Sequence, residues 1–166
     1  MNFTRRKFLQ YSLFFGFALA TRKGWANKLP MSVIERRDLY PQGVASGDPT
    51  ADSVILWTRR PPLNDSSSKK LIVEIAADQD FKKIVAGGTT FINAASDWTC
   101  RFLVKELKPN QEYWYRFVDE HGFASRVGRP ITAPSDDSET PVRFTFVSCQ
   151  CPNEGALNAY RRMIFE

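Results

Sequence analysis

The chain has 166 residues, 43% hydrophobic and 13% aromatic, which is enough for one ordinary domain and a further segment but too little for two complete domains. Its formal charge of +5 comes from the first 26 residues, which hold five basic residues and no acidic one and so leave 18 basic against 18 acidic residues. A neutral body excludes the clustered excess of Lys and Arg that binds nucleic-acid backbones, and we expect no specific nucleic-acid binding.

Residues 1–26 have the three parts of an export signal. Arg5 and Arg6 precede an apolar run at residues 11–20, and a small-residue site ends at Ala26, after which we expect cleavage. The run is shorter than the ~20 residues that span a bilayer, so we expect no transmembrane segment after cleavage. The T-R-R-x-F-L core resembles the twin-arginine class, which predicts export by the twin-arginine translocation machinery to the periplasm or the medium.

Two alternatives stay open in this segment. Cleavage after Ala20 is the second choice, and the whole segment is alternatively an amphipathic helix packed on the body. With cleavage at Ala26, residues 27–39 lead into the first domain.

Residues 40–134 predict an all-β domain. Short runs of β-branched and aromatic residues recur with turn signals about every ten residues, and no long amphipathic helix pattern interrupts them. These six or seven runs indicate a β-sandwich of the fibronectin type III or immunoglobulin-like kind. The expected strands cover residues 54–57, 71–76, 84–86, 100–104, 112–118, 124–126 and 128–132, with turns at residues 46–50 and at Gly87-Gly88.

The segment from Leu107 through Pro109 to Tyr113 resembles the tyrosine corner of fibronectin type III domains. It precedes a strand in which Tyr113, Tyr115 and Phe117 share one face. In that corner the ring fills the core and the hydroxyl bonds a nearby backbone group. The alternative is an ordinary hairpin entering an aromatic strand, which leaves the sandwich prediction unchanged.

The β segment contains no group of residues that predicts catalysis. His121, the one histidine of the chain, lies in a Gly-flanked turn without metal-ligand partners at suitable spacing, so we expect a solvated turn residue. Asp48 and Asp52 flank a Pro turn, where carboxylates accept backbone N–H bonds. We expect Cys100 to be a small buried apolar residue.

A new pattern follows the Pro-, Ser- and acid-rich linker at residues 135–141. Residues 142–147 predict a strand, and the apolar spacing beyond Asn153 predicts a helix, which together open an α/β domain. A segment this short cannot bury a core, so we interpret residues 142–166 as a truncated domain start and expect disorder or loose docking in isolation. Cys149 follows the strand, where ligands gather in α/β sheets, which makes a thiolate ligand for a transition metal one interpretation.

Three motifs in chain order resemble the alkaline phosphatase D family. They are G-V-A-S-G-D-P-T-x-D-S-V-I-L-W-T-R at residues 43–59, L-x-P-x-x-x-Y-W-Y-R-F at residues 107–117 and F-x-F-V-S-C-Q at residues 144–150. The resemblance implies that residues 40–134 are the N-terminal β-sandwich of the family and that its metallophosphatase domain begins at residue 142.

The same resemblance implies a function. Members of this family are exported by the twin-arginine route and hydrolyse phosphodiesters and phosphomonoesters with iron and calcium, and their strand-end cysteine, here Cys149, is an iron ligand. The other ligands of the family would follow Glu166, so we expect this chain alone to be inactive, with no catalytic residue of its own. Cys151 departs from the family pattern, and we expect a free peripheral thiol rather than a second ligand or a disulfide partner. The competing hypothesis is a non-catalytic secreted β-sandwich that serves as a binding or structural module.

Overall fold

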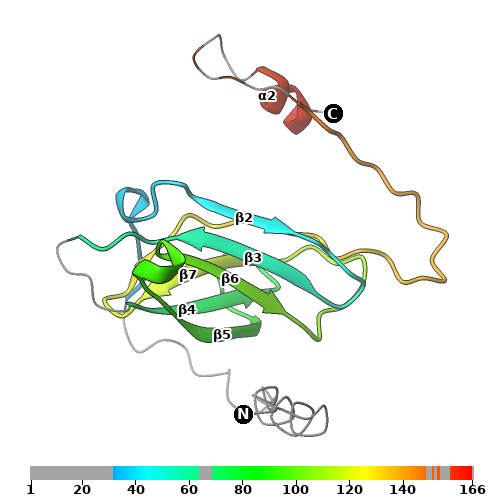
Figure 1. Cartoon of the computed structure of the whole chain (residues 1–166). Helices are drawn as coiled ribbons and strands as arrows, with labels where there is room; N and C mark the ends of the chain where they lie inside the picture. Colours follow the sequence, from blue (N-terminus) through cyan, green and yellow to red (C-terminus); the bar gives the residue numbers. More distant parts are fainter. Residues whose placement is uncertain (1–31, 64–68, 149–150, 152, 154–157, 166) are drawn as a thin grey trace, which may run out of the picture. The chain divides into compact units, whose positions relative to one another are not determined.

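The computed structural model describes residues 32–63, 69–148, 151, 153 and 158–165. It divides into two compact units, Met1–Ser135 and Asp136–Glu166. The described part of the first unit is a β-sandwich of a five-stranded sheet, with strand order β1-β8-β7-β4-β5, and a three-stranded sheet, with order β2-β3-β6 (Figure 1). We call them the large sheet and the small sheet. The predicted all-β sandwich is therefore confirmed.

The strands are short, and neighbouring strands run antiparallel except for the parallel pair β1 and β8. The large sheet contains β1 (Ile34–Glu35), β4 (Lys69–Ala76), β5 (Ile84–Ile92), β7 (Trp114–Asp119) and β8 (Phe123–Ala124), and the small sheet contains β2 (Val44–Gly47), β3 (Val54–Arg59) and β6 (Thr99–Val104). Two 3-10 turns, η1 (Arg37–Leu39) and η2 (Ala94–Ser96), connect strands.

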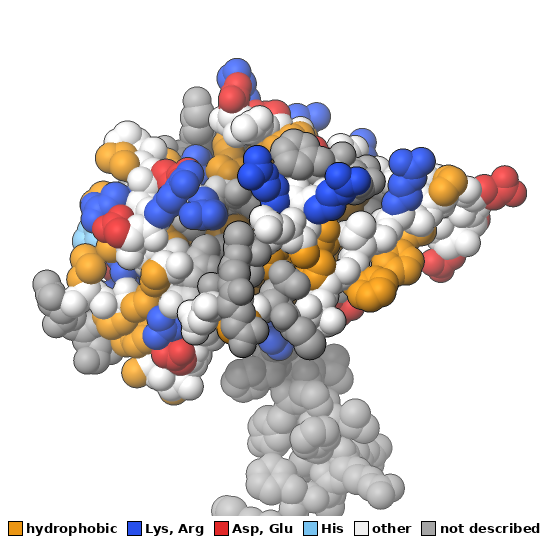
Figure 2. All heavy atoms as spheres, turned by 90° about the horizontal axis from the view of Figure 1, so that it is seen from above, with side chains coloured by type: hydrophobic (Ala, Val, Ile, Leu, Met, Phe, Trp, Pro, Cys, Tyr) orange, Lys and Arg blue, Asp and Glu red, His pale blue; other side chains and the backbone are white. Residues whose placement is uncertain are grey.

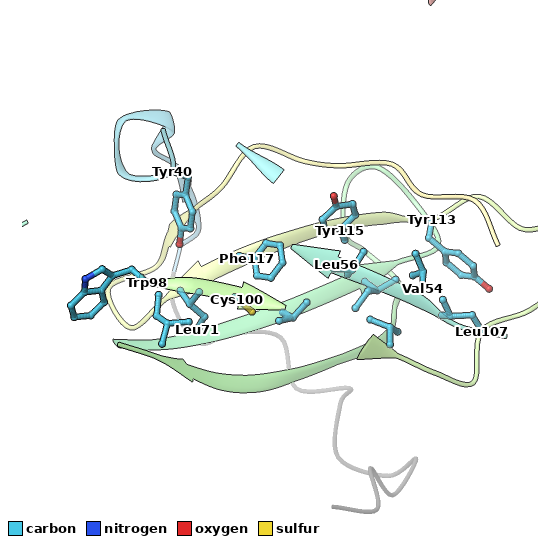
Figure 3. Packing of buried hydrophobic residues seen from close by; sticks show 14 of the residues in the cluster. Tyr40, Val54, Leu56, Leu71, Trp98, Cys100, Leu107, Tyr113, Tyr115 and Phe117 are labelled. Atoms are coloured by element: carbon cyan, nitrogen blue, oxygen red, sulfur yellow. The ribbon is translucent and has the colours of Figure 1, made fainter. Parts of the chain in front are cut away.

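The core lies between the two sheets because every second side chain of the central strands points inward. In β3 the buried positions are Val54, Leu56 and Thr58, while their neighbours are only partly buried. Tyr40 and Trp98 lie toward one end of the core, and Leu107 and Tyr113 toward the other (Figure 3). Each fully buried aliphatic or aromatic side chain contributes roughly 1.5–3 kcal/mol to folding. The other members of the cluster are Leu39, Leu71, Val73, Ile75, Ile92, Cys100, Val104, Tyr115 and Phe117.

One predicted turn is wrong, because Gly87 and Gly88 lie inside β5 rather than at its end. A Cβ atom on Gly88 would lie 2.1 Å from Cζ of Phe102, so the ring of Phe102 occupies the space where a side chain would stand. Glycine in a strand commonly marks such a close approach. The third strand is therefore longer than predicted: it includes both glycines and ends at Ile92.

The predicted turn at residues 46–50 is wrong in its first half. Ser46 and Gly47 complete β2, which pairs with β3 from Val44 opposite Thr58 to Gly47 opposite Ile55. The turn begins at Asp48, whose φ of 50° is left-handed. A strand of four residues at a sheet edge carries too few positions for an alternation signal.

The last two predicted strands of the sandwich are shorter than expected. Only Phe123–Ala124 forms strand β8, and the segment at residues 128–132 contributes two isolated bridges, Glu112 with Ile131 and Tyr115 with Gly128. Gly128 lies against the ring of Tyr115, where an added Cβ would come within 2.3 Å of ring carbons.

In the second unit, the strand predicted at residues 142–147 is not formed. Residues 141–148 have no regular secondary structure, and the side chains of Val142, Phe144 and Phe146 are 71%, 81% and 84% exposed. A strand needs a neighbour for its backbone hydrogen bonds, and no described strand pairs with this segment. The helix α2 (Asn158–Phe165) agrees with the predicted helix, whereas its predicted start next to Asn153 lies at residues 154–157, outside the described residues. The interpretation of this segment as an α/β domain start remains a prediction.

Candidate functional site

The predicted export and metal residues fall outside the described part of the chain. Arg5, Arg6, Ala20 and Ala26 precede residue 32, and Cys149 lies in the short gap after residue 148. Their assignments therefore remain predictions.

The two described cysteines have opposite environments. Cys151 is exposed and free, as the sequence predicts. Cys100 is free and buried in the core, where burial raises the pKa of its thiol to about 12. Because the thiolate is the form that binds metals and attacks electrophiles, Cys100 is a packing residue, which confirms the prediction.

The two other candidate residues, His121 and Asp52, lie in turns. The side chain of His121 is 65% exposed in the turn before β8, as predicted. Among the described residues, Asp52 accepts a hydrogen bond from the Thr50 hydroxyl at 3.0 Å rather than from a backbone N–H. Within the described residues, no group of three or more His, Cys, Asp or Glu side chains could hold a metal ion.

The tyrosine corner is present as predicted. Tyr113 and Leu107 are buried, and the backbone N–H of Lys108 donates to the Tyr113 hydroxyl at 2.8 Å. This bond ties the turn between β6 and β7 to the start of the aromatic strand. The motif therefore has a structural role at this end of the sandwich.

A buried ion pair, which the sequence prediction missed, lies at the opposite end. Arg60 Nη2 donates to Asp119 Oδ2 at 2.9 Å, and the two side chains are only 6% and 2% exposed. Asp119 Oδ1 also accepts the backbone N–H groups of His121 and Phe123 at 2.9 and 3.0 Å. Strand alternation could have found the pair, because Arg60 continues the inward positions of β3 and Asp119 those of β7.

Tyr40 completes this end of the core. Its hydroxyl donates to the carbonyl of Phe123 at 3.0 Å, and the guanidinium carbon of Arg60 lies 5.8 Å from the centre of its ring. Burial, and then the negative charge of Asp119, raise the pKa of Tyr40. Arg60, Asp119 and Tyr40 are thus enclosed, and they join the two sheets rather than offering groups to a substrate.

A second ion pair lies on the outer face of the large sheet. Arg116 Nε donates to Glu74 Oε2 at 2.7 Å across β7 and β4. The ring of Phe81 lies 4.1 Å from the Arg116 guanidinium carbon, a distance that favours a cation–π contact. This pair is also formed between residues of the sandwich.

Several Lys and Arg side chains are visible on the surface in the view of Figure 2. There, Lys and Arg side chains lie among acidic and hydrophobic ones (Figure 2). Within the described ranges, no helix has the length and apolar character required to cross a membrane.

Comparisons with known proteins identify relatives over most of the chain. The family described as PhoD-like phosphatase, N-terminal domain, matches residues 25–134. Alkaline phosphatase D of Bacillus subtilis (strain 168) is 36% identical over 179 aligned residues, which cover 99% of this chain and 30% of that protein.

A solved structure agrees with this relationship. A structure described as that of PhoD superposes with a TM-score of 0.71 and 33% identity, over 85% of this chain and 27% of that chain. The fn3 domain of the human collagen alpha-1(XX) chain is 12% identical with a TM-score of 0.40, over 71% of this chain and all of that domain. This chain spans less than a third of the length of the two phosphatase relatives. On these matches, the chain belongs to the alkaline phosphatase D family of PhoD-like phosphatases and carries the N-terminal domain of that family at residues 25–134.

Proposed function

We propose that this chain is the N-terminal portion of an exported alkaline phosphatase and phosphodiesterase that hydrolyses phosphoesters with iron and calcium. The observation that carries the proposal is the 36% identity to Alkaline phosphatase D over 99% of this chain. That span includes the segments of Arg5, Arg6 and Cys149 as well as the β-sandwich.

The described residues do not themselves fit an iron or calcium site. They contain no cluster of three or more ligating side chains, and the buried carboxylates Asp119 and Glu74 are paired with arginines. The proposal therefore assigns metal binding to the complete polypeptide, to which this chain contributes Cys149 as an iron ligand. One thiolate cannot fill the coordination sphere of a transition metal, so residues 27–166 alone are expected to be inactive.

The sandwich has a supporting role in this proposal. Its ion pairs and its tyrosine corner are formed within the sandwich, and Cys100 is held in its unreactive thiol form. The phosphoester substrate is therefore expected to bind elsewhere in the polypeptide.

A fusion tests the proposed chemistry. Residues 1–166 are joined to the part of Bacillus subtilis Alkaline phosphatase D that lies beyond the matched segment, and hydrolysis of a chromogenic phosphodiester is measured with iron and calcium. We expect the fusion to hydrolyse the ester, residues 27–166 alone to show no turnover, and Cys149→Ala to remove the activity of the fusion. Cys151→Ala, two residues away and exposed, is the matched control and should keep the activity.

Two outcomes would contradict this proposal. A fusion that is folded and loaded with metal but inactive argues against the phosphatase assignment. Sustained turnover by residues 27–166 that disappears in Cys149→Ala shows that this segment is an enzyme by itself.

Export is the second part of the proposal. Residues 1–40 fused to a folded reporter should direct it to the periplasm or the medium through the twin-arginine machinery, with cleavage after Ala26. Replacement of Arg5 and Arg6 by Lys should block transport, because this pathway recognises the arginine pair. Unchanged transport of the double variant contradicts the assignment.

The competing function is a secreted β-sandwich that serves as a binding or structural module without catalysis. The internally paired charges and the lack of a metal-ligand cluster in the described residues favour it. The fusion separates the two functions, because a module of this kind would not depend on Cys149 for any activity.

A further inference from the structure

Strand β5 forms one edge of the large sheet, where it pairs with β4 on one side and with no described strand on the other. It is the last strand in the order β1-β8-β7-β4-β5 and lies at the lower margin of the sandwich in Figure 1. An edge strand carries a row of backbone N–H and C=O groups that its own sheet does not use, and such a row pairs readily with another strand. The free side of β5 therefore offers these groups to a further strand.

The other three edges of the sandwich carry features that oppose pairing, and β5 lacks them. β1 and β2 have only two and four residues, and β6 carries the exposed Arg101 and is followed by the exposed Lys105. Short edge strands and charged side chains are common protections against unwanted pairing. β5 has nine residues, none of them charged and none of them proline, and its bulge at Val85 affects only its start. Residues 86–92 thus form a regular, uncharged edge.

Three residues of this regular part, Gly87, Thr89 and Phe91, lie on the outer face of the large sheet. Gly88 lies against the ring of Phe102 from the small sheet, so strand alternation turns its neighbours outward. Thr89 is exposed, and the side chain of Phe91 is 66% exposed. We call these three residues the β5 row.

The β5 row is complementary to itself when two copies of the strand run antiparallel around Thr89. In that register Thr89 lies opposite Thr89 of the second copy, and Phe91 lies opposite its Gly87. Threonine pairs are among the favourable cross-strand pairs, and an aromatic ring opposite a glycine of an edge strand covers the backbone that the glycine leaves bare. Residues 86–92 also include no charge that a two-fold axis would place next to its own copy.

We propose that two copies of this chain associate through the free sides of their β5 strands, antiparallel and centred on Thr89, so that the two large sheets become one continuous sheet. Each copy contributes the same surface, which is the arrangement of most homodimers. A contact along one short strand buries less than the ~1,200 Å² of a stable protein interface. We therefore expect a weak, reversible dimer in the upper micromolar range. This association goes beyond the proposed function and does not depend on the phosphatase chemistry.

Analytical ultracentrifugation of the 166-residue chain, from micromolar to millimolar concentration, tests the association. The mean mass should rise toward that of a dimer, and Thr89→Lys should weaken the association tenfold or more, because the two-fold axis places two lysines opposite each other. Leu103→Lys, at a 49% exposed position on the edge strand of the other sheet, is the matched control and should keep the association. A chain that stays monomeric throughout, or an association that Thr89→Lys leaves unchanged, overturns the proposal.

A disulfide cross-link tests the register and does not depend on the lysine variant. In a chain with Cys149→Ser and Cys151→Ser, Thr89→Cys is oxidised with copper phenanthroline. Directly opposite residues of antiparallel strands have Cα atoms ~4.5–5.5 Å apart, a distance that a disulfide spans, so a covalent dimer should form. Val85→Cys is the control and should give none, because its two copies would lie ~27 Å apart along the paired strands.

Three outcomes of the cross-linking would overturn the proposal. The first is the absence of a Thr89→Cys dimer at concentrations at which the chain associates. The second is equal cross-linking at Thr89 and Val85, which indicates random collisions rather than one register. The third is a Thr89→Cys dimer of the 166-residue chain that does not form in the fusion described above, which would show that the edge is covered in the longer polypeptide.

Discussion

Two glycines in the sandwich have opposite surroundings, and they predict opposite effects of the same change. Gly88→Ala should lower the free energy of unfolding by about 1–3 kcal/mol, because the new methyl group collides with the ring of Phe102. Gly47→Ala, in open space and without a left-handed φ, should raise it by about 0.4–1 kcal/mol by restricting the unfolded chain. Urea unfolding of the two variants measures the difference. Equal effects would show that Phe102 does not occupy the position above Gly88.

Two buried groups of the core, the Cys100 thiol and the Tyr115 hydroxyl, should make the folded state less stable at high pH. Burial raises the pKa of Cys100 from 9.0 to about 12 and that of Tyr115 from 10.0 to about 12. Both groups are neutral in the folded state, so their contribution is complete below pH 9, the ordinary pKa of an unfolded cysteine. It is lost as the pH rises toward 12, at up to about 1.4 kcal/mol per pH unit for each group.

Denaturant unfolding at pH 8, 9.5 and 11 measures this effect. Cys100→Val should reduce the loss of stability that begins near pH 9, because the Cys100 thiol of the unfolded chain titrates at lower pH than the Tyr115 hydroxyl, whereas Cys151→Ala, at an exposed position, should leave the profile unchanged. A profile that is flat up to pH 11 in the unsubstituted chain contradicts the buried environment of both groups.

At the scale of elements, the ion pair of Arg60 and Asp119 joins the end of β3 to the end of β7. Asp119→Ala should lower the free energy of unfolding by about 3–5 kcal/mol, because it leaves a buried guanidinium without its carboxylate. The double variant Arg60→Met and Asp119→Leu should recover much of that loss, since it removes both charges. Thermal unfolding of both variants measures this recovery.

An exposed pair serves as the control for the buried one. Asp80→Ala removes the partner of Lys82, and both of these side chains are more than 60% exposed, so it should change the free energy of unfolding by less than about 1 kcal/mol. If Asp119→Ala costs no more than Asp80→Ala, the pair is not buried as described.

The tyrosine corner fixes the turn between β6 and β7. Tyr113→Phe keeps the buried ring but removes the hydroxyl that accepts the N–H of Lys108. The free energy of unfolding should fall by about 0.5–1.5 kcal/mol, the usual net value of one hydrogen bond. Proton exchange of the Lys108 amide should quicken in the same variant, and unchanged exchange would show that another group protects this amide.

At the scale of the whole molecule, the two units are expected to differ in stability. The sandwich buries side chains from both sheets, whereas Val142, Phe144 and Phe146 of the second unit are exposed. Ordering a segment costs about 1–2 kcal/mol per residue in backbone entropy, which exposed side chains do not offset. Hydrogen exchange should be slow across Trp114–Asp119 and fast from residue 142 to residue 148. Equal protection of the two segments would contradict this difference.

The sequence by itself determined the class of fold and much of the core. Alternation in the predicted strand at residues 112–118 placed Tyr113, Tyr115 and Phe117 on the buried face, and the spacing from Leu107 to Tyr113 identified the corner. These signals are local, because they depend only on the period of a strand and on a short motif. The three sequence motifs at residues 43–59, 107–117 and 144–150 indicated the family, which the comparisons confirm.

Only the tertiary structure decided features that depend on residues far apart in the chain. Gly88 fits inside its strand because the ring of Phe102, from the other sheet, fills the space that a side chain would need. Arg60 is buried next to Asp119, 59 residues away, whose carboxylate accepts its hydrogen bond. The segment at residues 142–147 has the alternation of a strand but forms none, since a strand exists only where another backbone accepts and donates its hydrogen bonds. Local periodicity specifies which side chains share a face, whereas pairing and burial are properties of the assembled sheets.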